Sequence, residues 1–408
     1  MQHGVQGQSS ANCRPIMRQL QIAIIGAGIS GLTAAAALLR RGFDVHVYEQ
    51  APALGDVGAG LTVSPNATHA LHSIGLGPDL EQFGMVPAQG GVKHWRSGEL
   101  LTSIMRGDTM VQKYGAQYYQ IHRADLHVGL VRETCAAARP GVDPITLNCQ
   151  FVSSREQNGH LEIHFADGRV ARADVLIAAD GARSAVRTAV FGASQPTFTG
   201  YIAYRGLADM SRLAPQIITP TSCLSIGPKR SFTRYLVRAG TLVNYVGLAE
   251  RDDWREEGWS IPSSIPELLA EYDGWYADIH EIIRATPPDK VFKWALYDRE
   301  PLPEWNRGNV TLIGDAAHPM LPFLGSGAAM GIEDGVVLAR AFELAGSVAE
   351  ALRRYQEARL ERTTFVLLKS RETALQYHSG DTQGYQRRPH QSAESLGLMS
   401  YNPVTIAL

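Results

Sequence analysis

The stretch IAIIGAGISGLTAAAALL, at residues 22–39, decides the fold. It opens with an apolar run typical of a buried strand, is interrupted by three glycines, and continues as an Ala-rich run typical of a helix. The stretch VHVYE follows at residues 45–49 and indicates a second strand that ends in an acid. A strand, a glycine-rich turn, a helix and a second strand with a terminal acid are typical of a dinucleotide-binding βαβ unit.

The three glycines and the acid each have a physical task in such a unit. Gly26 permits the sharp turn, Gly28 lets the backbone approach a pyrophosphate without a Cβ, and Gly31 allows close packing of the helix on the strand. Glu49 is placed to accept hydrogen bonds from ribose hydroxyls. A membrane anchor or a signal peptide would also supply an uncharged run, but neither accounts for the glycine spacing or the second strand.

The composition narrows the class of protein. The chain has 408 residues, 45% of them hydrophobic, and a formal net charge of -2. This balance offers no basic stripe for nucleic acid and no polybasic segment for a membrane surface. The four cysteines lie far apart, which predicts no metal site, no disulfide framework and a reducing, cytoplasmic location. Residues 1–20 are polar and patternless, and we expect a disordered leader there.

Two later segments repeat the pattern of a buried strand followed by a glycine-containing turn. ADVLIAADGARSAVR, at residues 173–187, predicts a strand, a turn at Asp180 and a helix. VTLIGDAAHPMLPFLGSGAAMGIEDG, at residues 310–335, predicts a strand that runs into Gly314 and Asp315, a proline-containing loop and another helix.

In this order the three segments resemble the fingerprints of the single-component FAD-dependent aromatic hydroxylases, the p-hydroxybenzoate hydroxylase-like family. The texture is most similar to salicylate, 3-hydroxybenzoate and 6-hydroxynicotinate hydroxylases. The resemblance runs from residue 21 to about residue 340. It implies FAD as the bound cofactor, with NADH or NADPH as co-substrate.

The resemblance also implies roles for particular residues. Glu49 would bind the adenosine ribose, Asp315 the ribityl chain, and Arg123 and Asp180 would lie near the phosphates. The helix that begins near Gly327 would direct backbone N–H groups at the flavin ring. The candidate FAD-binding residues are Gly26, Gly28, Ile29, Ser30, Gly31, Glu49, Gly60, Arg123, Asp180, Gly314, Asp315, Gly325, Ser326, Gly327 and Ala328.

The substrate is expected beneath a β-sheet formed by residues 199–290, where short stretches alternate in polarity. Tyr235 falls where related hydroxylases have a substrate-facing tyrosine, although a packed strand aromatic is the open alternative. Tyr204 and Pro322 complete the candidate catalytic set. Four residues before the tyrosine, those relatives carry a histidine that helps to deprotonate the substrate, whereas this chain has Ser231. A hydroxyl with an ordinary high pKa cannot serve as the general base.

Two further residues are weaker candidates. Arg205 could contact a ligand or be a structural arginine, and His318 in the third segment could be a base or belong only to the flavin loop.

The predicted fold class is α/β, with an FAD-binding Rossmann-like βαβ domain, an inserted β-sheet substrate domain and a C-terminal helical segment. The expected divisions are 21–198 for the first part of the FAD domain with a substrate-side excursion near 83–112, 199–290 for the sheet domain, 291–345 for the return to the FAD domain, and 346–408 for the helical region.

The resemblance implies an FAD-dependent monooxygenase that hydroxylates an aromatic or N-heteroaromatic hydroxy acid with NAD(P)H and O2 through a flavin C4a-hydroperoxide. Its partners would be a small aromatic acid, O2 and NAD(P)H, with no nucleic acid and no membrane. Another flavin oxidoreductase of the same fold, or a flavin-binding regulatory protein without turnover, is the alternative. The sequence leaves open the substrate, the ring position, the choice of nicotinamide and the oligomeric state, a homodimer included. It also leaves open what replaces the general base at Ser231: another group could take the proton, or the substrate could enter ionised or need no such help.

Overall fold

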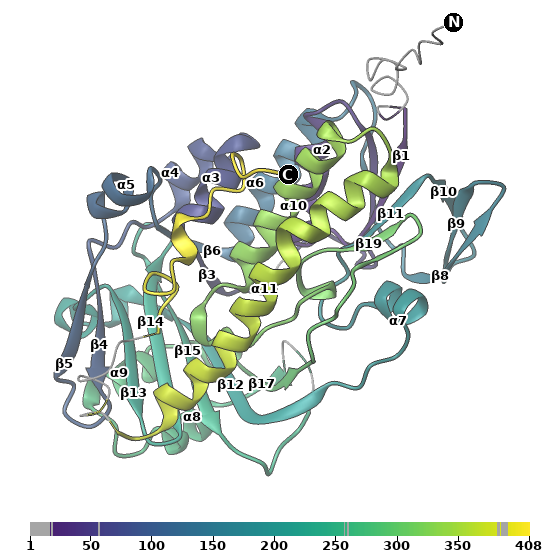
Figure 1. The fold of residues 1–408 in the computed structure, drawn as a ribbon. Helices are drawn as coiled ribbons and strands as arrows, with labels where there is room; N and C mark the ends of the chain where they lie inside the picture. Colours follow the sequence, from purple (N-terminus) through teal and green to yellow (C-terminus); the bar gives the residue numbers. More distant parts are fainter. Residues whose placement is uncertain are drawn as a thin grey trace, which may run out of the picture.

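The computed structural model describes residues 17, 19–55, 58–256, 258, 261–381, 384 and 391–408. Most of the expected leader lies outside the described residues. The described chain is mixed α/β with two large sheets, and a long C-terminal helix lies across both of them (Figure 1).

The first large sheet has six strands in the order β18-β19-β11-β1-β2-β7. Its strands are β1 Gln21–Ile25, β2 Asp44–Tyr48, β7 Ile145–Thr146, β11 Val175–Ala178, β18 Asn306–Arg307 and β19 Val310–Leu312. The central strand β1 is parallel to both β2 and β11, and β11 is parallel to β19. All residues of β11 are buried, as expected for a parallel strand covered on both faces. The three segments singled out in the sequence therefore start from neighbouring strands.

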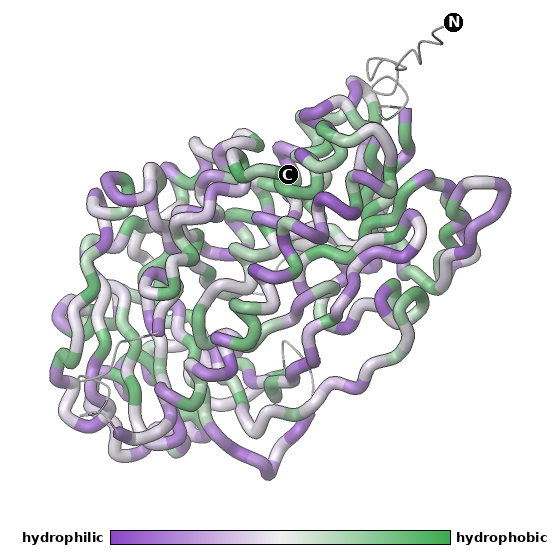
Figure 2. Tube along the Cα trace, in the orientation of Figure 1, coloured by the Kyte–Doolittle hydropathy of each residue, from purple (hydrophilic) through white to green (hydrophobic). Residues whose placement is uncertain are grey.

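Helix α2 Ile29–Leu39 packs on β1 and β2 of this sheet, and α6 Arg123–Ala137 and α10 Gly327–Leu344 pack on α2. The other helices of this part of the chain are α3 Pro65–Ser73, α4 Gly77–Phe83, α5 Asp108–Tyr114 and α7 Ala185–Phe191. Nine of the eleven residues of α2 are buried, so this helix is apolar all round. A Cβ at Gly335 of α10 would lie 2.7 Å from the backbone nitrogen of Ala34 in α2, so glycine permits this contact. Buried apolar residues of both helices and of β1 belong to one core cluster, and hydrophobic segments gather in this part of the molecule (Figure 2).

The second large sheet has eight strands in the order β16-β17-β12-β15-β14-β13-β4-β5. Its strands are β4 Gln89–His94, β5 Leu100–Met105, β12 Thr197–Asp209, β13 Ser222–Gly227, β14 Arg230–Val237, β15 Leu242–Glu250, β16 Ile261–Pro262 and β17 Val291–Asp298. Strands β4 and β5 come from the expected excursion near 83–112, and β17 extends the sheet beyond the expected division at residue 290.

The two faces of the eight-stranded sheet differ in what covers them. Helices α8 Ile265–Glu271 and α9 Ala277–Arg284 pack on one face, where Ile279, Ile282 and Ile283 are fully buried. The other face turns toward the loop that precedes α10 and toward α11 Val348–His378. This second face is the one that meets the six-stranded lobe.

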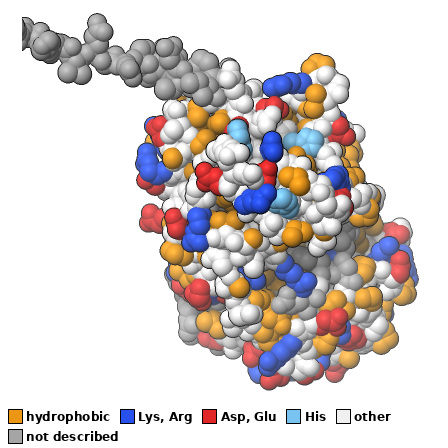
Figure 3. Space-filling view, turned by 90° about the vertical axis from the view of Figure 1, so that its right-hand side faces the viewer, with side chains coloured by type: hydrophobic (Ala, Val, Ile, Leu, Met, Phe, Trp, Pro, Cys, Tyr) orange, Lys and Arg blue, Asp and Glu red, His pale blue; other side chains and the backbone are white. Residues whose placement is uncertain are grey.

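Smaller elements complete the fold. They are the strands β3 Gly60–Val63, β6 Tyr119–His122, β8 Phe151–Gln157, β9 His160–Phe165 and β10 Val170–Ala173, and the 3-10 turns η1 Met210–Arg212, η2 Pro215–Ile218, η3 Pro288–Lys290, η4 Gly314–Ala316, η5 Pro322–Leu324 and η6 Leu398–Ser400. The final residues dock back on the helices, where Arg340 donates to the carbonyls of Pro403 and Ile406 at 2.8 Å. Among the described residues, no helix has the length and apolarity needed to cross a membrane. Acidic and basic side chains are interspersed on the face in Figure 3.

Candidate active site

The first glycine segment meets the second at the end of β1. Gly26 has a φ of +105°, and a Cβ there would lie 2.5 Å from the carbonyl oxygen of Ala179, the residue before Asp180. A Cβ at Gly31 would lie 2.0 Å from the carbonyl oxygen of Gly26. A Cβ at Gly28, in contrast, would have no atom within 4 Å. Gly26 and Gly31 are therefore needed for packing, whereas Gly28 presents bare backbone to open space at the start of α2.

The third segment meets the first through Ser30. Added Cβ atoms at Gly314 and Gly331 would lie 2.4 Å and 2.1 Å from the Ser30 hydroxyl oxygen. Gly314 has a φ of +57°, which an L side chain adopts only with strain. The three segments, separated by more than a hundred residues in the chain, thus converge at the N-terminus of α2.

Glu49 supports the glycine turn directly. Its carboxylate accepts hydrogen bonds from the backbone N–H groups of Ala27 at 2.7 Å and Ala51 at 2.9 Å. The side chain is only partly buried. These bonds hold the acid beside the turn, and its contact with an adenosine ribose stays a prediction.

The second segment is organised by Asp180. The carboxylate accepts from the Ser184 hydroxyl at 2.5 Å and from the Val186 N–H at 3.1 Å, and burial raises its pKa. Ser184 caps α7 by accepting from the Arg187 N–H at 2.8 Å. The buried Arg187 side chain donates to the carbonyl of Ala316 at 2.8 Å. Ser184 and Arg187 therefore have structural roles that join the second segment to the third.

Asp315 lies deep in the protein and still has accessible surface. Desolvation raises its pKa, while His318, Arg123 and Arg187 act in the opposite direction. Its side chain is nevertheless exposed to solvent. A deep carboxylate with accessible surface lines a hollow, which is what a residue for the ribityl chain requires. Arg123, the first residue of α6, is half-buried, and its backbone N–H donates to Ala59 at 2.8 Å.

His318 belongs to a buried charge cluster and does not face this hollow as a free base. Its Nε2 lies 2.6 Å from Asp334, which also accepts from the Gly314 N–H at 2.9 Å and from Arg359 at 2.7 Å. Burial opposes the charge on Asp334, but His318 and Arg359 lower its pKa to about 2. Glu333 completes the cluster by accepting from Arg362 at 2.9 Å. This cluster fixes the loop that begins at Gly314.

The loop before α10 is accessible to solvent at two of its residues. Pro322 and Gly325 are exposed, and Gly325 has a φ of +59°. Thr62 of β3 donates to the Gly325 carbonyl at 3.2 Å, so β3 lies beside this loop. Helix α10 then starts at Gly327 with Ser326 as its N-cap residue and Ala328 in its first turn. The N-terminus of a helix this long favours a partial negative charge on a ligand.

Tyr235 lies where β3 meets the eight-stranded sheet. A Cβ at Gly60 would lie 2.7 Å from the Tyr235 ring and 2.8 Å from the Asn244 side chain. Asn244 accepts from the Gly60 N–H at 2.7 Å. Burial raises the pKa of Tyr235 well above its ordinary value. The tyrosine expected at the substrate and the glycine expected at the cofactor are therefore in contact.

The strand register places Arg205 on the same face as Tyr235. Tyr235 pairs with Asn244 across β14 and β15, and in the next row Arg205 pairs with Val246. Directly paired residues share a face of the sheet, and so do alternate residues of one strand. The Arg205 guanidinium lies 5.5 Å from the ring of Trp294 and is 4% exposed.

The structure does not bring Tyr204 to this site, and the expectation for this residue is wrong in position. As the neighbour of Arg205 on β12, its side chain points to the opposite face. There it is fully buried, and its hydroxyl donates to Glu267 of α8 at 3.2 Å. Tyr204 and Arg205 are adjacent in the sequence, which gave no signal of which one lies on the face of Tyr235.

The residues that line this region fit an FAD. Bare backbone at Gly28 suits a pyrophosphate, Asp315 suits a polyhydroxyl chain, and the N-terminus of α10 suits the electron-accepting edge of the ring. Sequence reasoning missed Asn244 and Thr62, which hold β3 against the sheet and the loop. Neither residue lies in a motif, so only the fold reveals them.

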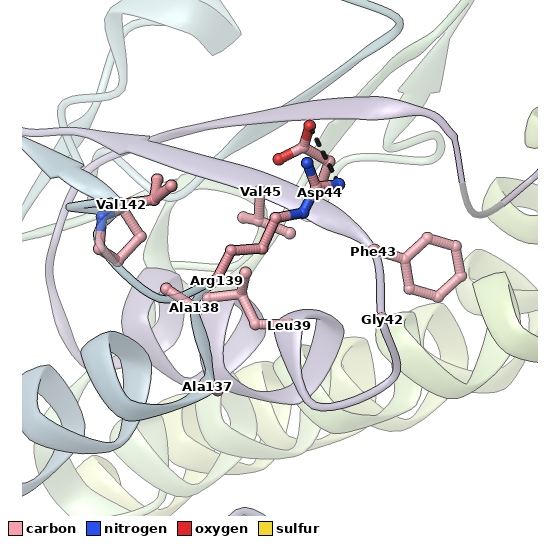
Figure 4. Close-up of a pocket in the computed structure, with 10 residues that line it drawn as sticks. Leu39, Gly42, Phe43, Asp44, Val45, Ala137, Ala138, Arg139 and Val142 are labelled. Carbon is pink, nitrogen blue, oxygen red and sulfur yellow. Dashed lines mark ion pairs between the residues drawn. The ribbon is translucent and has the colours of Figure 1, made fainter.

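Two other features lie apart from this site. A surface pocket near the C-terminal ends of α2 and α6 contains the ion pair between Arg139 and Asp44, at 3.6 Å (Figure 4). In the described part of the chain, no group of three or more His, Cys, Asp or Glu residues could hold a metal ion.

Comparison with known proteins identifies the family. The chain matches the FAD binding domain family over residues 19–370. A 3-amino-4-hydroxybenzoate 2-monooxygenase of Streptomyces platensis is 38% identical over 92% of this chain and 93% of the relative. A 6-hydroxynicotinate 3-monooxygenase of Bordetella bronchiseptica is 36% identical over 85% of this chain and 89% of the relative.

A solved structure has the same fold. The crystal structure of Klebsiella pneumoniae HpxO with FAD and uric acid has a TM-score of 0.81 and 27% identity, covering 93% of this chain and 96% of that one. The convergent glycine segments and these matches agree. The chain therefore belongs to the FAD binding domain family of flavoprotein monooxygenases, with FAD as its cofactor.

Proposed function

We propose that the protein hydroxylates an aromatic or N-heteroaromatic hydroxy acid, with NADH or NADPH and dioxygen as co-substrates. The single observation that carries the proposal is the contact of Gly60, a candidate cofactor residue on β3, with Tyr235 on one face of the eight-stranded sheet. The relatives act on aminohydroxybenzoate and hydroxynicotinate, which are acids of this class. When bound, FAD supplies the redox chemistry and the activation of oxygen.

The chain's own residues would bind and orient the substrate. Arg205 would pair with the substrate carboxylate, because a guanidinium matches a carboxylate in two parallel hydrogen bonds. Tyr235 would donate its hydroxyl proton to an oxygen on the ring, since its raised pKa keeps the phenol protonated. Leu224, Val246 and Trp294 form apolar surface on the same face and would exclude water from the ring.

The candidate cofactor residues keep their expected roles within this proposal. Glu49, Arg123 and Asp180 would serve the adenosine and phosphate end, and Asp315 the ribityl chain. Pro322, exposed at the start of η5, would lie over the flavin beside the substrate. The substrate hydroxyl would enter ionised, because Ser231 cannot act as a general base and His318 is held by Asp334.

A panel of aromatic acids tests the proposal. Purified holoprotein is mixed with each acid and with NADH or NADPH, and nucleotide consumption is followed together with product mass under 18O2. Stimulated consumption with one 18O atom in the product supports a hydroxylase. Stimulated consumption without incorporated oxygen indicates another flavin oxidoreductase, and a yellow protein indifferent to every acid indicates a flavin-binding regulatory protein.

Location and assembly complete the proposal. A cytoplasmic location fits the three described cysteines, Cys135, Cys149 and Cys223, which are all free. Exposed apolar residues of α11, Phe365, Leu368 and Leu375, would be covered in a homodimer. Light scattering of the holoprotein decides between monomer and dimer.

A further inference from the structure

The last residue of α11 reaches the sheet at the position where the sequence lacks a histidine. His378 Nε2 lies 3.0 Å from the Ser231 hydroxyl, although 147 positions separate the two residues. The backbone is joined at the same place, because the Lys229 N–H donates to the His378 carbonyl at 3.0 Å. His378 is 6% exposed and Ser231 is 1% exposed. The end of α11 is therefore anchored on the turn between β13 and β14.

The His378 ring also joins the sheet to the flavin loop. Its centroid lies 5.0 Å from the ring of Tyr201 on β12 and 5.4 Å from the ring of Phe323 in η5, both in edge-on contact. Phe323 and Tyr201 contact each other at 5.3 Å. One imidazole thus touches the sheet, the loop beside the cofactor and the strand that carries Tyr235.

The register puts this contact on the substrate face. Ser231 pairs with Leu248 in one row of the sheet. The next row on this face holds the pair Arg205 and Val246, and the row after that holds the pair Tyr235 and Asn244. Rows of alternate residues are about 7 Å apart, so Ser231 and Tyr235 lie about 14 Å apart along the sheet, with the row of Arg205 between them. His378 covers the Ser231 end.

We propose that His378 is a positioning residue for the substrate, which orients the Ser231 hydroxyl and closes the far end of the substrate face against Phe323. The inference rests on the proposed function, because it concerns how that substrate is held. His378 acts through Ser231 and the loop, and it does not exchange a proton with the substrate.

The surroundings of His378 keep its ring neutral. Burial, followed by the charge of Arg230 on β14, lowers the pKa of His378 to about 4. Lys229 in the adjacent turn is a second cation, and the phenol ring of Tyr201 on β12 packs edge-on against the imidazole. Its Nδ1 is buried and has no hydrogen-bond partner among the described residues. A neutral imidazole with one hydrogen-bond partner can orient the hydroxyl of that partner, but it does not take up a proton readily near neutral pH.

Three variants test the inference. His378→Phe keeps an aromatic ring between Tyr201 and Phe323 but removes the hydrogen bond, Ser231→Ala removes the other partner, and the double variant closes a thermodynamic cycle. Val152→Ala is the control, because Val152 lies on β8, away from α11 and the substrate face, and is 56% exposed. Ser231→Ala also covers the case in which the larger change prevents folding.

The readouts separate positioning from acid-base catalysis and from stability. For the substrate found in the panel, we expect the dissociation constant by calorimetry to rise about 3- to 10-fold in each single variant, with little further loss in the double variant. More of the consumed NAD(P)H should end as hydrogen peroxide, and the inflections of kcat/KM against pH should stay where they are in the wild type.

Unchanged affinity and peroxide yield in folded variants would overturn the inference and leave the proposed function intact. Loss of a wild-type inflection in His378→Phe would also overturn it, in favour of a proton-transfer role. A wild-type protein that turns over no aromatic acid refutes the proposed function and this inference together.

Discussion

Alanine at Gly28 and at Gly31 should have opposite effects on folding and on FAD binding. A Cβ at Gly31 would lie 2.0 Å from the Gly26 carbonyl oxygen and 3.1 Å from the Ala179 side chain. Because a backbone oxygen cannot move without breaking the turn, we expect a cost near the upper end of the overpacking range, about 3 kcal/mol. The better helix propensity of alanine returns about 1 kcal/mol. The apoprotein should therefore lose about 2 kcal/mol.

Gly28→Ala should leave the apoprotein nearly intact. The φ of -76° and ψ of -179° at this position are ordinary for alanine, and its Cβ would meet no atom within 4 Å. The only expected loss is weaker capping of α2, of up to about 1 kcal/mol. The new methyl group would instead occupy the space that a pyrophosphate needs, and FAD affinity should fall at least about 10-fold.

The assay compares urea unfolding of the two apoproteins with FAD titration of each by fluorescence quenching. The reasoning is refuted if Gly28→Ala binds FAD as tightly as the wild type, or if it unfolds at lower urea than Gly31→Ala. Either result would mean that the open space at Gly28 is not where the phosphates lie.

Four further predictions follow from single contacts. Asp334→Asn should cost about 3 kcal/mol, because it removes one of the two buried carboxylates that pair with Arg359 and leaves only Glu333, and the released flavin measures the damage to the loop. In the wild type, the pKa of Asp334 is about 2 in the folded state and 3.8 in the unfolded state. Its contribution to the free energy of unfolding is therefore complete above pH 4 and is lost as the pH falls toward 2. The free energies of unfolding of wild type and variant should converge there. The pKa of His378 is also lowered, from 6.5 to about 4, so the unfolded state binds more protons between these two pH values. Stability therefore falls as the pH drops through that window. His378→Gln should make the free energy of unfolding depend less steeply on pH in acid titrations. Tyr235→Phe should fold normally and raise KM about 2- to 10-fold, whereas Arg205→Gln should weaken binding of the acid and not of its amide, and equal effects on both would exclude a carboxylate contact.

The sequence predicted best those features that depend on the conformation of neighbouring residues in the chain. Gly26 and Gly31 were expected to permit a turn and a close helix, and the contacts at Ala179 and at the Gly26 carbonyl confirm those tasks. The family and its cofactor followed from three such segments, because each segment folds from residues that are neighbours in the chain. Tyr235 lies beside Gly60 of β3, and its contact with a substrate stays a prediction.

The sequence was least informative where a side chain depends on distant residues. Tyr204 and Arg205 are adjacent, and only the register of β12 with β15 shows which of them faces the cofactor lobe. His378 meets Ser231 across 147 positions, and no local pattern marks His378 as the residue that lies there. The placement of β4 and β5 in the eight-stranded sheet likewise depends on parallel pairing with β13, which no local pattern encodes.

The order of strands in the six-stranded sheet also constrains how the chain can be made. Its adjacent strands β1, β11 and β19 begin near residues 21, 175 and 310. Strand β1 therefore leaves the ribosome long before β11, which pairs with it, and β19, which pairs with β11, have been synthesised. Pairings of such high contact order form slowly and leave apolar edges open in the meantime. We therefore expect refolding in the test tube to be limited by the docking of β19, and soluble yield to improve with slower synthesis at low temperature.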